Sequence, residues 1–216
     1  ELSLLQFQRR VLAQAADPAM PLLERLRFLC IVSSNLDEFF EVRVAGVKEQ
    51  QRLGSLVLTT DGLTPSELQS RISREVHSLI TDQYNLLNNT ILPALAAEGI
   101  VFLRRSVWTD AQHLWARDYF IREVMPVLTP IGLDPAHPFP RVLNKSLNFA
   151  VELEGRDAFG RSSGAAIVQA PRALPRVIRL PKDLTGVDYG FVFLSSMLHA
   201  HVGELFEGMN VLGCYQ

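Results

Sequence analysis

A polar stretch inside an apolar helical pattern has the residue types needed to recognise a ligand. It reads SSNLDEFFEVR and covers residues 33–43, with Asn35 at the centre of one apolar side of the helix. The apolar residues on that side are Phe28, Ile31, Phe39 and Val42. A carboxamide offers both a donor and an acceptor, so it could read the edge of a heterocycle beside these side chains. The alternative is a structural asparagine that bonds to a neighbouring loop, because a buried amide needs partners.

Three carboxylates and one guanidinium follow in the same stretch. Asp37, Glu38 and Glu41 could act as paired acid and base, but Asp37 and Glu38 point about 100° apart around a helix. Their spacing therefore favours a solvated or salt-bridged face. Arg43 most simply pairs with a carboxylate, although a fork-shaped donor on a central helix could also face a phosphate.

The five histidines give no pattern for catalysis or for metal binding. His199 and His201 resemble a chelating pair, but residues two apart on a helix face nearly opposite sides and cannot hold one ion. We interpret both as surface groups. His137 lies in the loop sequence DPAHPFP and is expected to bond to backbone, with its role left open. His77 and His113 lie on amphipathic helices with no partner indicated.

A cluster of arginines is the remaining candidate for ligand contact. Arg172, Arg176 and Arg179 lie in APRALPRVIRLP, where they could face a phosphate-rich ligand or merely flank a strand. The sequence contains no Walker A loop, GxGxxG, GxSxG or HExxH motif.

The first 99 residues carry three helical patterns joined by short connections, which predicts an antiparallel three-helix bundle. The helices are expected over about 4–15, 21–53 and 64–99. Ser3 with Gln6, and Thr64 with Glu67, have the spacing of capping boxes at helix starts. Pro93 is expected to kink or break the last turns of the third helix.

The pattern changes after Gly99 to short strands with two helices among them, which predicts a mixed α/β domain. Strands are expected at IVFLR, SLNFAVEL, GAAIVQA, RVIRL, YGFVFL and NVLGCYQ, and helices over 109–125 and 195–206. The prolines in PVLTPIGLDPAHPFP favour an extended loop over a regular element. The fold class is therefore α+β, with a helical domain over 1–99 and a second domain over 100–216. The second domain is expected to be truncated at its carboxyl end, because NVLGCYQ has no residues left to pair with.

Composition narrows the classes of protein. A net charge of −2 gives no overall positive field to attract nucleic acid or an anionic membrane. No stretch has the roughly 20 apolar residues that a transmembrane helix needs. The two cysteines have neither metal-ligand nor disulfide-framework spacing, which fits a reducing compartment. We expect a cytoplasmic protein that could associate peripherally with membranes.

The first 50 residues resemble the amino terminus of bacterial polyphosphate kinases. The resemblance rests on ELSLLQFQRRVL, PLLERLRFL and SSNLDEFFEVRVAG, and continues through VMPVLTPIGLDPAHPFP, LPRVIRLP and LFEGMNVLG, so it spans essentially the whole chain. Two residues depart from the family pattern. Leu4 stands where tryptophan is usual, and Gln8 stands where asparagine is usual.

The resemblance implies a function for a longer protein. The family transfers the terminal phosphate of ATP reversibly to inorganic polyphosphate through a phosphohistidine, with Mg²⁺. Its subunit has an amino-terminal helical domain, a head domain and two phospholipase-D-like catalytic domains, and this chain resembles the first two. The phosphorylated histidine and the Mg²⁺ ligands belong to the catalytic domains, so no catalytic or metal-binding residue and no cofactor is assigned here, and the chain is expected to be inactive alone.

The asparagine of the NLDEF motif contacts the base of ATP or ADP in the family, and it corresponds to Asn35. The head domain resembles the part that the family uses for subunit contacts, which implies a homo-oligomer, most simply a dimer. The alternative is a purely structural or oligomerisation module without ligand contact. The path of polyphosphate, the role of Arg172, Arg176 and Arg179, and the regulation stay open.

Overall fold

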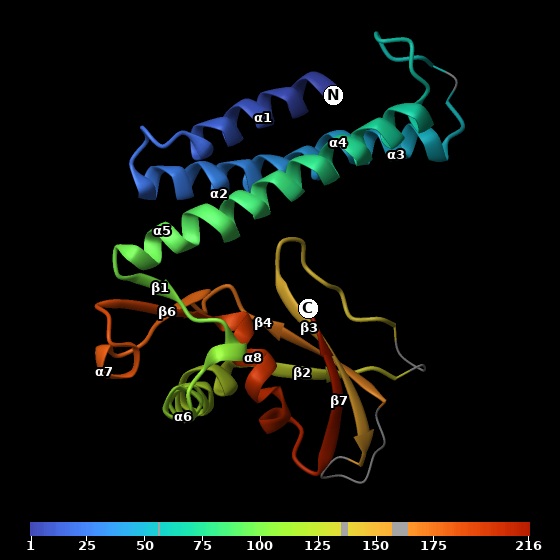
Figure 1. The fold of residues 1–216 in the computed structure, drawn as a ribbon. Helices are drawn as coiled ribbons and strands as arrows, with labels where there is room; N and C mark the ends of the chain where they lie inside the picture. The colour runs from blue at the N-terminus through green and yellow to red at the C-terminus, as the bar shows by residue number, and fades with distance from the viewer. Residues whose placement is uncertain (56, 135–137, 157–163) are drawn as a thin grey trace. The chain divides into compact units, whose positions relative to one another are not determined.

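The computed structural model describes residues 1–55, 57–134, 138–156 and 164–216. The chain divides into two compact units, Glu1–Glu98 and Gly99–Gln216, which we call the helical unit and the head unit (Figure 1). His137 lies outside the described residues. Within the described part, no helix combines the length and apolarity that crossing a bilayer requires.

The helical unit is built from three long helical segments, each antiparallel to the next (Figure 1). The first is α1, Leu2–Ala16; the second joins α2, Leu22–Glu38, η1, Phe39–Val44, and α3, Ala45–Arg52; the third joins α4, Pro65–Leu86, η2, Leu87–Ile91, and α5, Leu92–Ala97. Their apolar stripes meet in a core that includes Leu5, Val32 and Leu79. This arrangement confirms the predicted three-helix bundle.

Two of the long segments contain a wide π-type turn. In η1 the Ala45 amide reaches back five residues to the carbonyl of Phe40. As a result Phe39 and Val44, five residues apart, are both buried, whereas Phe40 is 42% exposed. A regular 3.6-residue repeat would put Phe40 on the core side of the helix. The wide turn instead places Phe39 in the core and leaves Phe40 exposed.

The predicted helix starts have mixed outcomes. Thr64 accepts a hydrogen bond from the amide of Glu67, and the Glu67 carboxylate accepts one from the amide of Thr64, which confirms that capping box. The capping box expected from Ser3 and Gln6 is wrong, because α1 begins at Leu2 without a side-chain cap. Pro93 does not break the third segment. It sits in the first turn of α5, just after the wide turn η2, where its missing N–H costs little.

The described residues of the head unit form two sheets. In the three-stranded sheet, the central strand β6 pairs in parallel with β1 and antiparallel with β5. These strands are β1, Ile100–Phe102, β5, Val177–Arg179, and β6, Tyr189–Phe193. The four-stranded sheet is antiparallel with the order β2-β4-β3-β7. These strands are β2, Thr129–Gly132, β3, Leu147–Gly155, β4, Ala165–Ala170, and β7, Met209–Tyr215.

Helices of the head unit pack with both sheets around one core. The longer helical pieces are α6, Asp110–Tyr119, followed by the wide turn η4, Phe120–Val124, and α8, Leu194–His201. Short helical pieces are η3, Arg105–Val107, η5, Met125–Val127, α7, Lys182–Thr185, and η6, Val202–Leu205. Phe120, Phe149, Val192 and Met197 are fully buried and bring together residues of both sheets and of the helices. This confirms the predicted mixed α/β domain.

Two expectations about strands are wrong. The extended loop predicted from the prolines does not include residues 129–132, which form the edge strand β2; Pro130 is tolerated there because one side of the strand needs no partner. The segment NVLGCYQ was expected to have no partner. It pairs through β7 with β3, which precedes it by more than 50 residues in the chain.

Candidate functional site

Asn35 lies in a pocket of about 380 Å³ within the helical unit. The lining residues are Leu4, Phe7, Gln8, Asn35, Glu38, Phe39, Val42 and Arg43. They come from α1, the end of α2 and the wide turn η1. The pocket has apolar walls with a few polar groups, which is the usual composition of small-molecule sites.

The Asn35 side chain has one internal partner. Its Nδ2 donates a hydrogen bond to Gln8 Oε1 at 2.9 Å, which links α2 to α1. Gln8 is only 8% exposed, while Asn35 is half-buried. Within the described part of the chain, Asn35 Oδ1 accepts no hydrogen bond. The Asn35 amide is therefore bonded through its nitrogen, and its oxygen stays available as a hydrogen-bond acceptor in the pocket.

The wide turn η1 helps to shape this pocket. It supplies Phe39, Val42 and Arg43, and the unusual turn begins directly after Glu38, which also lines the pocket. Phe39 is buried at the pocket, whereas Val42 is 61% exposed. π-type turns are rare and frequently occur at functional sites, because they change which side chains share a face.

Charged groups lie at the exposed side of the pocket. Glu38 and Arg43 are both exposed, and neither forms an ion pair with any residue that the structure describes. The carboxylate pairing that the sequence suggested for Arg43 is thus not found there. Asp37 and Glu41 are exposed as well, in agreement with a solvated acidic face.

This arrangement suits binding better than bond-breaking chemistry. The pocket holds one carboxylate and no histidine or cysteine, so its lining offers no nucleophile with an adjacent base. Across the described ranges, no three His, Cys, Asp or Glu residues come together as a metal site. A flat apolar group could lie against Phe7, Phe39 and Val42 while its polar edge meets Asn35.

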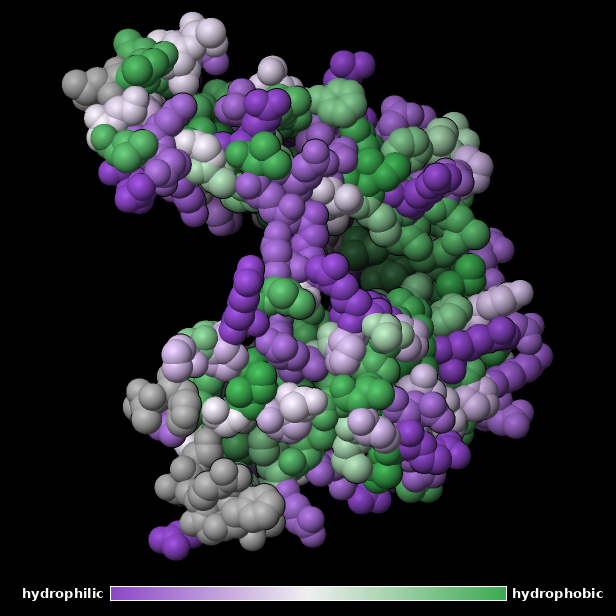
Figure 2. Space-filling model, turned by 180° about the vertical axis from the view of Figure 1, so that it is seen from behind, coloured by the Kyte–Doolittle hydropathy of each residue, from purple (hydrophilic) through white to green (hydrophobic). Residues whose placement is uncertain are grey.

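Exposed apolar residues alone do not single out this pocket. Among the described residues of the helical unit, the exposed ones are Leu4, Phe7, Leu23, Ile31, Phe40, Val42, Leu53, Val57, Leu58, Ile80 and Tyr84. Figure 2 shows apolar and polar groups interspersed on one face of that unit. The pocket differs because a half-buried amide with an open acceptor lies among its apolar side chains.

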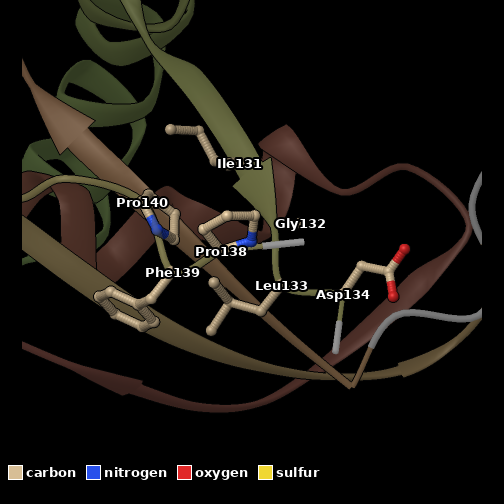
Figure 3. Close-up of a pocket in the computed structure, with 7 residues that line it drawn as sticks. All are labelled: Ile131, Gly132, Leu133, Asp134, Pro138, Phe139 and Pro140. Carbon is tan, nitrogen blue, oxygen red and sulfur yellow. The ribbon is translucent and has the colours of Figure 1, made fainter. Parts of the chain in front are cut away.

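A second cavity, of about 530 Å³, lies in the head unit. It is lined by Ile131, Gly132, Leu133, Asp134, Pro138, Phe139 and Pro140 (Figure 3). In Figure 3 the Asp134 carboxylate points away from the apolar group formed by Leu133, Pro138 and Phe139. Its apolar lining shows no convergent polar groups, so it is a weaker candidate than the Asn35 pocket.

Each of the three arginines named in the sequence analysis donates a hydrogen bond to a backbone carbonyl. Arg172 donates to the carbonyl of Asn144, Arg176 to that of Ala170, and Arg179 to that of Asp188, at 2.9, 3.3 and 2.7 Å. The Arg179 guanidinium also lies 5.2 Å from the centre of the Tyr189 ring. These contacts tie the arginines to three different parts of the chain.

The interpretation of His199 and His201 as surface groups is wrong. Both are partly buried against aromatic rings, His199 at 5.1 Å from Phe149 and His201 at 5.9 Å from Phe120, measured between ring centres. Burial lowers the pKa of each imidazole, and the positive charge of Arg105 lowers the pKa of His199 further. The two rings therefore pack into the head unit against different partners.

Gln8 lines the pocket, although the sequence marks it only as a departure from the family pattern and indicates no place in the site. It occupies a core position of α1, in a row with Leu5, Leu12 and Ala15. A polar residue on a core stripe is a signal in itself, but the identity of its partner depends on how α1 packs against α2, which the sequence does not give.

Comparison with known proteins identifies both halves of the chain. Residues 1–103 match the polyphosphate kinase N-terminal domain, and residues 111–216 match the polyphosphate kinase middle domain. The chain is 65% identical over all its 216 residues to a polyphosphate kinase of Neisseria meningitidis serogroup B, and 60% identical to one of Burkholderia vietnamiensis. It covers 32% and 31% of these two proteins, so it spans about a third of their length.

A crystal structure of polyphosphate kinase from Porphyromonas gingivalis has the same fold. It is 28% identical, aligns with 97% of this chain at a TM-score of 0.78, and 30% of that chain is covered. Sequence and fold agree on the assignment. This chain belongs to the polyphosphate kinase family and comprises its N-terminal and middle domains.

Proposed function

We propose that this chain supplies the base-binding side of an ATP or ADP site in a polyphosphate kinase. The complete enzyme would reversibly transfer the terminal phosphate of ATP to inorganic polyphosphate. The observation that carries the proposal is the Asn35 amide, which keeps an open acceptor in a pocket with apolar walls. A purine has the matching features, a flat apolar face and a polar edge.

The chemistry itself is assigned to parts of the protein outside these residues. The Asn35 pocket contains no histidine, and the described residues form no cluster of metal ligands. In this proposal the phosphohistidine and the Mg²⁺ ligands belong to the catalytic domains of the complete enzyme, as the family resemblance implies. In this proposal the helical unit orients the nucleotide, and the head unit contributes to contacts between subunits of a dimer.

Replacement of Asn35 by alanine tests the nucleotide role. In a full-length enzyme that carries this chain, Asn35→Ala is expected to raise the KM for ATP roughly tenfold with little change in kcat, because it removes about one hydrogen bond to the bound base. The measurement is steady-state synthesis of polyphosphate over a range of ATP concentrations. The KM for ADP in the reverse reaction should rise by a similar factor.

A matched control is available on α4. Asn85 is an exposed helical asparagine outside the pocket, so Asn85→Ala should leave both KM values unchanged. Unchanged ATP kinetics in a folded Asn35→Ala enzyme would contradict the nucleotide role. That result would favour the alternative, in which this part of the chain serves only structure and assembly.

A further inference from the structure

We infer that Gln8 is a positioning residue that orients the Asn35 amide, so that the pocket prefers a base with a hydrogen-bond donor at that edge. This inference rests on the proposed nucleotide role of Asn35. It concerns a different residue, on a different helix, and it adds a selectivity that the presence of an amide alone does not give.

Without a hydrogen-bond partner, an asparagine amide has no fixed orientation of its N–H and C=O groups. Rotation about the last side-chain bond is broad and roughly two-fold, so the N–H and C=O groups can exchange places. In the structure Asn35 Nδ2 donates to Gln8 Oε1 at 2.9 Å, so the nitrogen faces α1 and the carbonyl oxygen is left for the ligand. The exchanged arrangement, in which Gln8 Nε2 donates to Asn35 Oδ1, would present the N–H instead and reverse the preference between bases, so the ATP/ITP ratio of the parent enzyme distinguishes the two.

Gln8 is suited to this task because its own position is fixed. It is 8% exposed and lies on the core stripe of α1, between the buried residues Leu5 and Leu12. Its side chain lines the same pocket as Asn35. A packed side chain loses less freedom when it holds a neighbour, so it positions that neighbour better than an exposed one.

The exposed oxygen accepts a hydrogen bond and cannot donate one. A base with an amino group at that edge, such as adenine, can donate to Asn35 Oδ1. A base with a carbonyl in the same place, such as hypoxanthine, would oppose one acceptor with another and leave both without a partner. The arrangement therefore favours ATP over ITP, in which a 6-oxo group and a protonated N1 replace the 6-amino group and unprotonated N1 of adenine.

The test compares kcat/KM for ATP and ITP in the full-length enzyme. Gln8→Met keeps a long side chain but removes the acceptor, so the Asn35 amide can turn. We expect the KM for ATP to rise roughly threefold to tenfold, with kcat nearly unchanged, and the ATP/ITP ratio to fall by a similar factor. Gln8→Glu retains an acceptor and should keep the ratio within about twofold.

A purely structural role of Gln8 would not change the ratio, because loss of packing affects both nucleotides alike. If Asn35→Ala raises the KM for ATP but Gln8→Met leaves the ATP/ITP ratio unchanged, the orienting role is wrong and the nucleotide role stands. If Asn35→Ala has no effect on ATP, both are wrong. Circular dichroism and thermal unfolding establish that each variant is folded.

A second variant keeps the inference testable if Gln8→Met does not fold. Asn35→Asp presents only acceptors, so the base meets an oxygen whichever way the side chain turns. The ATP/ITP ratio should then be retained or increased, even if the added charge weakens the binding of both nucleotides. A ratio that falls in Asn35→Asp would overturn the inference.

Discussion

The hydrophobic pattern of the sequence points to the Asn35 amide but not to Gln8, the residue to which it is hydrogen-bonded. The amide at position 35 could be recognised from the sequence because apolar residues surround it at helical spacing. Its partner could not, because Gln8 is 27 residues away and the contact exists only once α1 packs on α2. The same holds for Gln83, whose buried amide donates to the carbonyl of Leu29 and to Ser33 Oγ.

The two buried imidazoles predict a dependence of stability on pH. Burial lowers the pKa of His199 and His201 below their ordinary value of about 6.5. Just below pH 6.5 these two histidines therefore bind protons more readily in the unfolded chain than in the folded head unit. The free energy of unfolding is therefore expected to decrease as pH falls below about 6.5, with no contribution from these groups above it.

Urea unfolding at pH 7.5 and 5.5 measures this effect. The two tryptophans, Trp108 and Trp115, both lie in the head unit, so their fluorescence follows that unit. Replacing His199 and His201 together by phenylalanine should reduce the loss of stability at pH 5.5. His77→Phe, a change in the helical unit, serves as the control. An undiminished pH dependence in the double variant would show that the imidazoles are not its source.

Regular apolar repeats in the sequence predict the helices well, whereas departures from the repeats do not follow from the sequence. The three long helical segments follow from apolar steps of three and four, and Thr64 caps as its spacing indicates. The wide turns η1 and η2 do not follow from these steps, because a π-type turn interrupts the regular 3.6-residue repeat. β2 and β7 were misjudged for a similar reason, since strand pairing joins residues far apart in the chain.

Two glycines have opposite surroundings, so replacing each by alanine is expected to have opposite effects on stability. Gly190 lies buried in the central strand β6, and a Cβ there would stand 2.8 Å from Thr185 Cβ. Gly190→Ala is expected to destabilise the head unit by about 1–3 kcal/mol. Gly46 lies in α3 with nothing within 4 Å of an added Cβ, so Gly46→Ala should stabilise the helical unit by about 0.5–1 kcal/mol.

Each glycine variant has its own measurement. Tryptophan fluorescence in urea follows Gly190→Ala, and thermal unfolding by far-ultraviolet circular dichroism follows Gly46→Ala. Adding Thr185→Ser to Gly190→Ala removes the γ-methyl group that lies nearest to the new side chain, and should restore part of the stability. A Gly190→Ala head unit as stable as the original would mean that β6 and α7 can separate without cost.

The chain spans about a third of the length of its curated relatives. His77 contacts the carbonyl of Ser73, His113 lies 5.2 Å from the Trp108 ring, and the other two described histidines pack on phenylalanines. None of these four histidines lines the Asn35 pocket.

We therefore expect the purified 216-residue chain to transfer no phosphate to polyphosphate. Incubation with radiolabelled ATP, Mg²⁺ and a polyphosphate primer measures this, with a full-length relative as the positive control. Label in the polymer at a rate above a blank without protein would refute the assignment of the nucleophile to other domains.

The position of Leu4 on the wall of the Asn35 pocket has a practical consequence. Both tryptophans lie in the head unit, so the natural chain has no indole among its first 98 residues. An indole at position 4, the residue type usual there in the family, would place an optical reporter beside the amide. Quenching of its emission would then register the arrival of a purine directly, independently of turnover.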